Sequence, residues 1–215
     1  MKKKILIMVI ITVCIAEFIN AQKASFGITA GATLSNMYSK IDNEKDHGKT
    51  HPGFTFGILT DIPIGQKCSI QPALNFVQKG TEDEDPDFDE KMKLNINYLE
   101  LPVNFIYRAN SSGNHFFFGG GPAIAYAISG KLKYEWSGNK EEYDVNFGND
   151  ESDDFKPFDF GINGLVGYQL KNGLMFTLNY THGFGNLIIG DADDGKLKNT
   201  SFGLKIGYLF GHSGK

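Results

Sequence analysis

Charged side chains that interrupt small or apolar stretches are the residues of this 215-residue chain best placed to do chemistry. They are Asp61, Glu100, Arg108, Asp159 and Lys205, and Arg108 is the only arginine. If all five point into one confined space, opposite charges must pair, because an isolated buried charge is unfavourable by several kcal/mol. A proton- or ion-conducting path is the alternative. We expect a structural polar cluster, with Glu100 paired to Lys205 and the pair shared with Arg108 or bridged by water.

Acidic runs are the second candidate, since closely spaced carboxylates can bind calcium. The larger run lies within residues 80–92, and a smaller one precedes Gly195. Neither has the spacing, turn glycine and terminal glutamate of an EF-hand loop. We expect solvated loops with at most loose cation binding, and no metal or other cofactor. The acidic residues are Glu82, Asp83, Glu84, Asp85, Asp87, Asp89 and Glu90, then Asp191, Asp193 and Asp194.

Hydrolytic chemistry would need a nucleophile beside a base that a third group orients. His115 follows Ser111 and Ser112 closely, and His182 adjoins Thr181. Neither pair has an obvious third group, and the chain lacks the Gly-x-Ser-x-Gly, His-Glu-x-x-His and phosphate-loop motifs. We therefore expect no enzymatic activity.

The N-terminus predicts the compartment. Lys2, Lys3 and Lys4 precede an apolar run over residues 5–16, and small residues precede Gln22. This is typical of a secretory signal peptide, here residues 1–21, and the run is too short for a spanning helix. Cleavage removes three lysines and one glutamate from 21 basic and 25 acidic residues, leaving 18 and 24, a net charge of −6. We expect no nucleic-acid binding, and no intrachain disulfide, since Cys68 alone remains.

Large apolar residues alternate with small or polar ones throughout the mature chain, residues 22–215. This period of two predicts β-strands with one apolar face. The apolar phase slips between Tyr98 and Leu99, where we expect a β-bulge. The predicted strands are residues 24–34, 53–61, 68–79, 93–108, 115–127, 158–170, 174–181 and 202–210.

The connections and the face chemistry predict the architecture. Short links at 62–67, 109–114 and 171–173 alternate with long ones at 35–52, 80–92, 128–157 and 183–199. The face opposite the bulky residues is mostly small and polar, which suits a narrow lumen with the aromatics facing lipid. We predict an all-β, eight-stranded antiparallel up-and-down transmembrane β-barrel that is monomeric and surrounded by outer-membrane lipid. Both termini would be periplasmic and the long acidic loops extracellular.

Aromatic residues should then form two girdles at the membrane interfaces. The predicted periplasmic set is Phe26, Tyr107, Phe116, Tyr168, Tyr208 and Phe210, and the outer set is Tyr38, Phe54, Phe76, Tyr126, Phe158, Tyr180 and Phe202.

Several motifs resemble a known family. The most specific is Tyr98-Leu99-Glu100-Leu101-Pro102-Val103, joined by Pro52-Gly53-Phe54, Ile70-Gln71-Pro72-Ala73-Leu74 and Gly119-Gly120-Gly121-Pro122. They resemble the outer-membrane β-barrel domain of Bacteroidetes, the PorT family. The resemblance implies an outer-membrane barrel and, from one member, an accessory role in protein secretion with envelope or secretion proteins as partners. A structural or interaction role is our first expectation. A small lipid-active enzyme or a narrow channel is the alternative.

Overall fold

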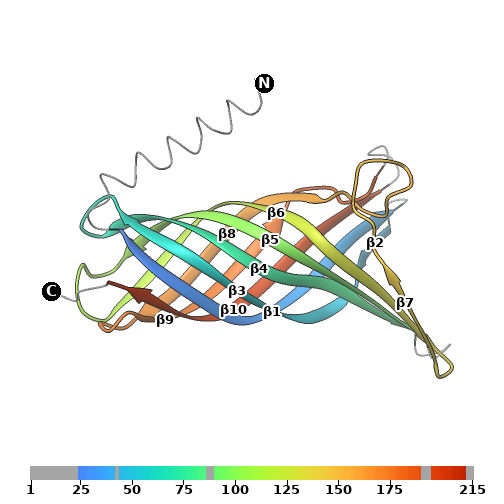
Figure 1. Cartoon of the computed structure of the whole chain (residues 1–215), viewed down its shortest axis with the longest axis horizontal. Helices are drawn as coiled ribbons and strands as arrows, with labels where there is room; N and C mark the ends of the chain where they lie inside the picture. The colour runs from blue at the N-terminus through green and yellow to red at the C-terminus, as the bar shows by residue number, and fades with distance from the viewer. Residues whose placement is uncertain (1–23, 42–43, 86–89, 190–194, 212–215) are drawn as a thin grey trace, which may run out of the picture.

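The computed structural model describes residues 24–41, 44–85, 90–189 and 195–211, so the predicted signal peptide lies outside the described residues. Eight strands close into an antiparallel ring in which each pairs with its sequence neighbours, and β1 pairs with β10 (Figure 1). The predicted eight-stranded antiparallel fold is confirmed. The ring strands are β1 (Ser25–Ile41), β3 (Lys49–Pro63), β4 (Cys68–Asp85), β5 (Glu90–Arg108), β6 (His115–Trp136), β8 (Phe158–Gln169), β9 (Leu174–Gly183) and β10 (Lys196–Phe210).

Alternating side chains produce these strands. In β6, Phe116 and Phe118 are 63% and 55% exposed, whereas Phe117 between them is 4% exposed and faces the interior. Glycines on the inner side let adjacent strands lie close together. At Gly121, for example, an added Cβ would overlap the carbonyl oxygen of Val103 on β5. No helix among the described residues is long and apolar enough to cross a membrane.

The strands are longer than predicted at one end of the barrel. β4 reaches Asp85 and β5 begins at Glu90, so most of the predicted loop over residues 80–92 is paired strand. β6 continues to Trp136 and turns into β7 (Asn139–Asp144), and β2 (Glu44–His47) pairs with β1. The sequence rule missed these extensions because their residues are polar on one face and mixed on the other. We call the end of the barrel that carries these strand extensions the loop end. The short links and both described chain ends lie at the opposite turn end (Figure 1).

The predicted bulge is confirmed only in part: the β5–β6 register shifts between Asn97 and Tyr98, but β5 is not the bulged strand. β5 alternates between inward and outward side chains without interruption, with Tyr98 buried and Leu99 exposed. The extra residue is Ile128 in β6, because Asn97 pairs with Ser129 and Tyr98 with Ala127. What changes along β5 is therefore the chemistry of its two faces, and not the direction in which each side chain points.

This change divides the molecule into two regions. In the barrel body, the outward side chains are mainly apolar, and the inward side chains at its centre are polar. A row of outward amides and a hydroxyl, Gln78–Asn97–Ser129, hydrogen-bonded at 3.3 and 3.0 Å, marks its limit. Beyond that row, the ends of β4, β5 and β6 with β7 form what we call the projecting sheet. Its outer face continues the outward side of the body, and its inner face continues the interior.

Apolar clusters occupy the interior toward both ends. At the turn end the cluster is Leu59, Ile106, Phe117, Met175 and Leu209. At the loop end it is Met37, Leu94, Ile96, Tyr98, Ala125 and Ala127, against which Leu132, Val145, Phe147, Phe155 and Leu197 pack. The polar side chains of the interior lie mainly between and around these two clusters.

Candidate functional site

The centre of the barrel body holds a buried ion pair that differs from the expected one. Lys79 Nζ lies 2.6 Å from Glu100 Oε2, and both side chains are almost fully buried. The Lys79 ammonium also lies 5.3 Å from the ring centroid of Tyr98. Among the described side chains, Glu100 forms its ion pair with Lys79 and not with Lys205, so the predicted direct Glu100–Lys205 pair is wrong. Lys205 lines the same central cavity of about 40 Å3 as Glu100.

Asp61 and Arg108 pair near the turn end. Arg108 Nη2 lies 2.6 Å from Asp61 Oδ2, and both side chains are buried. Ser69 completes the group, since its hydroxyl donates to Asp61 Oδ1 at 2.6 Å and accepts from Arg108 Nη1 at 3.0 Å. This group is separate from the Lys79–Glu100 pair, so the structure does not bring Arg108 to Glu100 or Lys205.

Asp159 is held by amides and has no ion pair among the described residues. Asn199 Nδ2 donates to Asp159 Oδ2 and to the Tyr98 hydroxyl, each at 3.1 Å. Asn163 links further strands by donating to Asn104 Oδ1 at 2.9 Å and accepting from Thr181 Oγ1 at 3.0 Å. The interior polar layer therefore consists of hydrogen bonds and ion pairs that join several strands, and the bond from Asn199 of β10 to Tyr98 of β5 crosses the lumen. Asn199 Oδ1 and Arg108 Nε have no hydrogen-bond partner among the described residues.

The nucleophile–base candidates are not assembled into a catalytic group. Thr181 points inward to Asn163, whereas the Nδ1 of its neighbour His182 contacts the Tyr180 hydroxyl at 3.3 Å on the other face of β9. His115 is buried with Nδ1 2.9 Å from the Gly113 carbonyl oxygen, and Ser111 and Ser112 are exposed.

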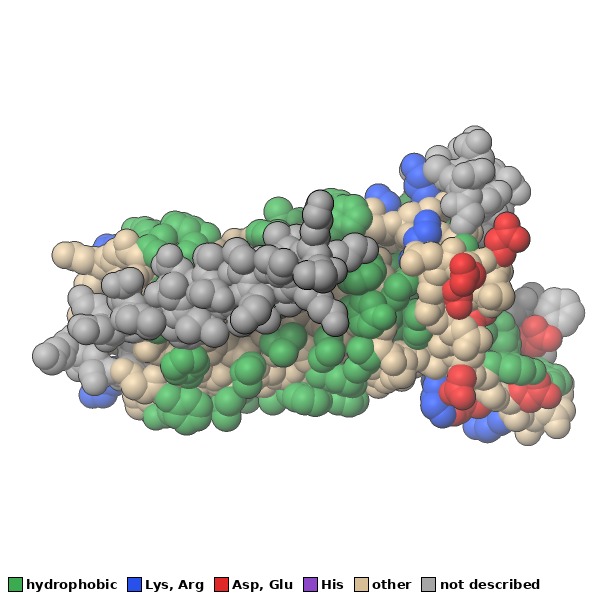
Figure 2. Space-filling model, turned by 45° about the horizontal axis from the view of Figure 1, so that its top comes forward, with side chains coloured by type: hydrophobic (Ala, Val, Ile, Leu, Met, Phe, Trp, Pro, Cys, Tyr) green, Lys and Arg blue, Asp and Glu red, His purple; other side chains and the backbone are tan. Residues whose placement is uncertain are grey.

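Apolar side chains cover the outside of the barrel body (Figure 2). Aromatic rings gather in two bands on this surface. Near the turn end, Phe116 contacts Tyr168 with ring centroids 4.7 Å apart. Farther along, Tyr126 contacts Phe158 at 4.9 Å, and Tyr180 contacts Phe202 at 4.6 Å. Paired aromatic bands of this kind are typical of the two interfaces of a transmembrane barrel.

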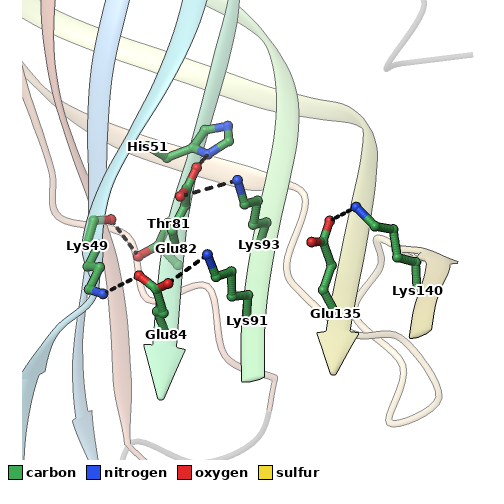
Figure 3. Close-up of polar contacts among 9 residues, drawn as sticks. All are labelled: Lys49, His51, Thr81, Glu82, Glu84, Lys91, Lys93, Glu135 and Lys140. Carbon is green, nitrogen blue, oxygen red and sulfur yellow. Dashed lines mark hydrogen bonds and ion pairs between the residues drawn. The ribbon is translucent and has the colours of Figure 1, made fainter. Parts of the chain in front are cut away.

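The outer face of the projecting sheet carries charges in cross-strand rows, and charged side chains gather at this end of the molecule (Figure 2). In one row, Glu84, Lys91, Glu135 and Lys140 are successive neighbours on β4, β5, β6 and β7. Glu84 binds both Lys49 and Lys91 at 2.7 Å, and Glu135 binds Lys140 at 2.9 Å (Figure 3). Directly opposed opposite charges stabilise a sheet pair by modest amounts.

A second row runs beside the first. Glu82 lies between Lys49 and Lys93 in the register, and its carboxylate contacts Lys93 at 3.5 Å and His51 at 3.0 Å (Figure 3). Glu142 on β7 pairs with Lys133 at 2.8 Å and also with Lys131.

These contacts shift the titration of the acidic groups. Hydrogen bonds from Lys49 and Lys91 lower the pKa of Glu84 from 4.5 to about 2. Hydrogen bonds from Lys131 and Lys133 lower the pKa of Glu142 to about 2 as well. Both carboxylates therefore remain ionised, and matched to lysines, over the ordinary pH range.

The inner face of the projecting sheet is aromatic and acidic. A groove of about 520 Å3 lies there, above the loop-end cluster. Its lining includes seven residues of the inner face, Asp83, Glu90, Met92, Tyr134, Trp136, Glu141 and Tyr143, together with Glu84, Lys91 and Glu135 of the outer-face row. The two faces of one thin sheet thus present different chemistry.

The acidic run over residues 80–92 is only partly described. Glu82 and Glu84 are engaged by lysines, and within the described ranges no group of three His, Cys, Asp or Glu residues could hold a metal ion. Asp87, Asp89, Asp191, Asp193 and Asp194 lie outside the described residues.

Two functional features escaped the sequence analysis. Lys79 is the last residue of the predicted strand 68–79, and the inward alternation of Asn75 and Val77 continues to it. The residues of the projecting sheet fall in predicted loops, and the signal for their pairing is the opposite charge of Glu82 and Glu84 on β4 and of Lys91 and Lys93 on β5.

Several known proteins are similar to this chain. Among solved structures, the chain is similar to Ail, the attachment invasion locus protein of Yersinia pestis, at 16% identity and a TM-score of 0.45, covering 88% of this chain and 100% of Ail. It is similar to OprG of Pseudomonas aeruginosa at 15% identity and a TM-score of 0.46, covering 87% and 96%. Neisserial surface protein A matches at 12% identity and a TM-score of 0.45, covering 88% and 100%.

A comparison with curated proteins returned no match. The family of the outer membrane protein beta-barrel domain matches residues 20–188, which is most of the chain. With its closed eight-stranded ring and its apolar outer surface, this chain belongs to the outer membrane protein beta-barrel domain family.

Proposed function

We propose that this protein is a filled outer-membrane barrel whose role is to present the projecting sheet to partner proteins outside the cell. The observation that carries the proposal is the projecting sheet itself, a paired and charged structure that extends past the apolar body. A barrel that only filled space in the membrane would not need strands ordered so far beyond the amide row of Gln78, Asn97 and Ser129.

Partner capture tests this role directly. Residues 131–144, the upper part of the β6–β7 hairpin, would be replaced by a short turn, and a photo-crosslinker would be placed at the exposed Lys49 of β3, beside the projecting sheet, a position that both the full-length and the shortened protein retain. We expect crosslinks to envelope or extracellular proteins that disappear when the hairpin is shortened. A matched crosslinker at Lys67, at the turn end, should give a different set. Crosslinks that are unaffected by the shortened hairpin would contradict the interaction role.

The orientation follows from the same proposal, with the chain ends in the periplasm and the projecting sheet outside. The native Cys68 lies at the turn end, where β4 begins, and it is partly exposed. We expect a membrane-impermeant maleimide to label Lys140→Cys in a Cys68→Ser background on intact cells. Cys68 of the unmodified protein should react only after the outer membrane is permeabilised. The reverse pattern would invert the proposed orientation.

The filled lumen is supported by the two interior apolar clusters and by a central cavity of only about 40 Å3, the space of one or a few water molecules. Planar-bilayer recordings should show no large, stable, ohmic conductance. Such a conductance would instead favour the channel alternative. The absence of an assembled base and nucleophile at Thr181 and His182 counts against the lipid-active enzyme.

An accessory role in protein secretion is the second candidate, and the PorT-like motif Tyr98–Val103 favours it. This motif supplies both Tyr98 and Glu100 of the buried polar layer. Deleting the gene and comparing the proteins of the culture medium with those of the parent strain would test it. An unchanged set of released proteins would remove this candidate.

A further inference from the structure

The inner face of the projecting sheet has the layout of a ligand groove. Asp83, Met92, Tyr134 and Glu141 are register neighbours across β4, β5, β6 and β7, so their side chains form one row. The next row pairs Glu90 with Trp136. Together with Tyr143, these residues line most of the groove of about 520 Å3 described above.

The aromatic lining stays accessible to water. Tyr134 and Tyr143 are 37% and 51% exposed, and their rings meet edge to face with centroids 6.2 Å apart. Trp136, the single tryptophan of the chain, lies one row farther out on β6. These rings lie beyond the membrane-facing band and on the opposite face of the sheet from it, so lipid does not account for their exposure. Exposed aromatic faces attract cations as well as apolar groups.

The carboxylates of the groove differ from those of the outer face in one respect. On the outer face, Glu82, Glu84, Glu135 and Glu142 each form an ion pair with lysine. Asp83, Glu90 and Glu141 form none with any described lysine or arginine, and the bond to Glu141 comes from the Tyr143 hydroxyl. Uncompensated negative charge on the projecting sheet is therefore concentrated on the inner face, beside the rings.

We propose that this groove binds a basic, extended peptide segment of a partner protein, a proposal that rests on the interaction role above. Lysine or arginine side chains lie against Tyr134 and Trp136, and their charged ends pair with Glu90 and Glu141. The unpaired carboxylates repel anionic lipid and acidic segments. A neutral oligosaccharide could stack on the rings but would leave the three carboxylates without counterions.

Trp136 reports occupancy of the groove directly, because no other tryptophan contributes to the fluorescence. The experiment uses the full mature protein in detergent micelles and titrates it with a short peptide of alternating lysine and serine. A peptide of alternating glutamate and serine and a neutral maltooligosaccharide are the matched probes. We expect saturable change in Trp136 fluorescence with the lysine peptide only, weakened by salt as charge screening requires.

Substitutions then locate the site, with binding followed by anisotropy of a labelled lysine peptide. Trp136→Ala and Glu141→Gln should each weaken binding about two- to fivefold, the size of one exposed cation–π or ionic contact. Glu142→Gln is the control, since its side chain is the next along β7 and points to the outer face. A heat-modified gel shift, in which the folded barrel migrates differently from the boiled chain, verifies that each variant is folded.

Binding that survives Trp136→Ala and Glu141→Gln, equal binding of the glutamate peptide, or binding of the oligosaccharide alone would overturn the proposal. The outcome is separable from that of the crosslinking test. If hairpin-dependent crosslinks persist while the lysine peptide fails to bind, the interaction role stands and the ligand class is wrong. If crosslinks are absent but the peptide binds at Trp136, the groove stands and the proposed partner role falls.

Discussion

The barrel body and the projecting sheet share β4, β5 and β6, yet the polarity of the inner and outer faces of β5 is exchanged between the two regions. In the body, Leu99 and Leu101 of β5 face outward, and Glu100 between them faces a polar interior. Farther along the same strand, Lys91 and Lys93 face outward, and Leu94 and Ile96 face inward. The alternation is continuous, so the surroundings alone explain the exchange. Lipid favours apolar outer surfaces, and water favours charged ones.

Charges follow the same division. Each region contains lysine–carboxylate pairs at similar distances, 2.6 Å for Lys79–Glu100 and 2.7 Å for Lys91–Glu84. The Lys79–Glu100 pair is buried, so water cannot solvate either charge if its partner is removed. The Lys91–Glu84 pair is exposed, so water solvates both charges even without the partner. The two pairs have similar distances, but removing one partner costs far more in the buried pair, because the remaining charge is left desolvated.

The largest expected effect comes from breaking the buried pair. Glu100→Gln leaves Lys79 enclosed without its carboxylate and leaves Lys205 beside the same cavity. We expect the free energy of unfolding to fall by about 3–5 kcal/mol, measured by urea unfolding in phospholipid vesicles. Glu135→Gln, which removes the exposed partner of Lys140, is the matched control and should change little. Adding Lys79→Met to Glu100→Gln should recover part of the loss. Equal effects of Glu100→Gln and Glu135→Gln would remove the distinction between the regions.

The second effect maps the boundary between the regions. Leu101→Arg places a charge on the lipid-facing side between the aromatic bands and should cost about 2–4 kcal/mol. The same substitution at Leu99 should cost less, and Asn95→Arg, on the outer face of the projecting sheet, should be nearly neutral. Unfolding of the three variants in vesicles gives the profile. A cost at position 95 as large as at position 101 would mean that lipid reaches the projecting sheet.

A smaller effect lies at the junction. The Tyr98 hydroxyl accepts a hydrogen bond from Asn199 at 3.1 Å and joins the polar layer to the loop-end cluster. Tyr98→Phe should lower the free energy of unfolding by about 0.5–1.5 kcal/mol, the usual net value of one such bond. Tyr134→Phe, on the exposed groove, should be neutral in the same urea titration. An unchanged free energy of unfolding in Tyr98→Phe would show that this hydrogen bond does not couple the polar layer to the loop-end cluster.

The smallest effect concerns the outer-face charges. Glu84 has its pKa lowered to about 2, so its ion pairs contribute to stability above the unfolded value of 4.5, and the contribution is lost as pH falls through about 2. Carboxyl-carbon NMR titration of Glu84 should give a midpoint near 2 at low salt. High salt, or removal of both lysines by Lys49→Met and Lys91→Met, should move the midpoint up toward 4.5. A midpoint near 4.5 at low salt would mean that the lysines do not hold Glu84.

Period-two alternation predicted the ring well, since it reports which side chains share a face, and lipid sorts those faces strongly. The pattern was misleading where the apolar residues change from the outer face of the sheet to the inner face. The apolar residues of β5 move from even to odd positions after Tyr98, which looks like a bulge in β5 when only hydrophobicity is followed. The partner of Glu100 could not be predicted either, because Lys79 and Lys205 both face inward and the choice depends on strand tilt and stagger. The aromatic and acidic groove needed the β6–β7 pairing, which residues of mixed polarity do not reveal.

The pairing of β1 with β10 also constrains the order of events during assembly. These are the first and last strands of the ring, and their register runs from Phe26 opposite Phe210 to Lys40 opposite Lys196. Before the 15 residues of β10 arrive, one long side of β1 has no backbone partner, and hydrocarbon does not tolerate such an edge. Entry into the lipid and closure of the ring must therefore coincide, and another molecule must shield that edge until the C-terminal strand has been delivered.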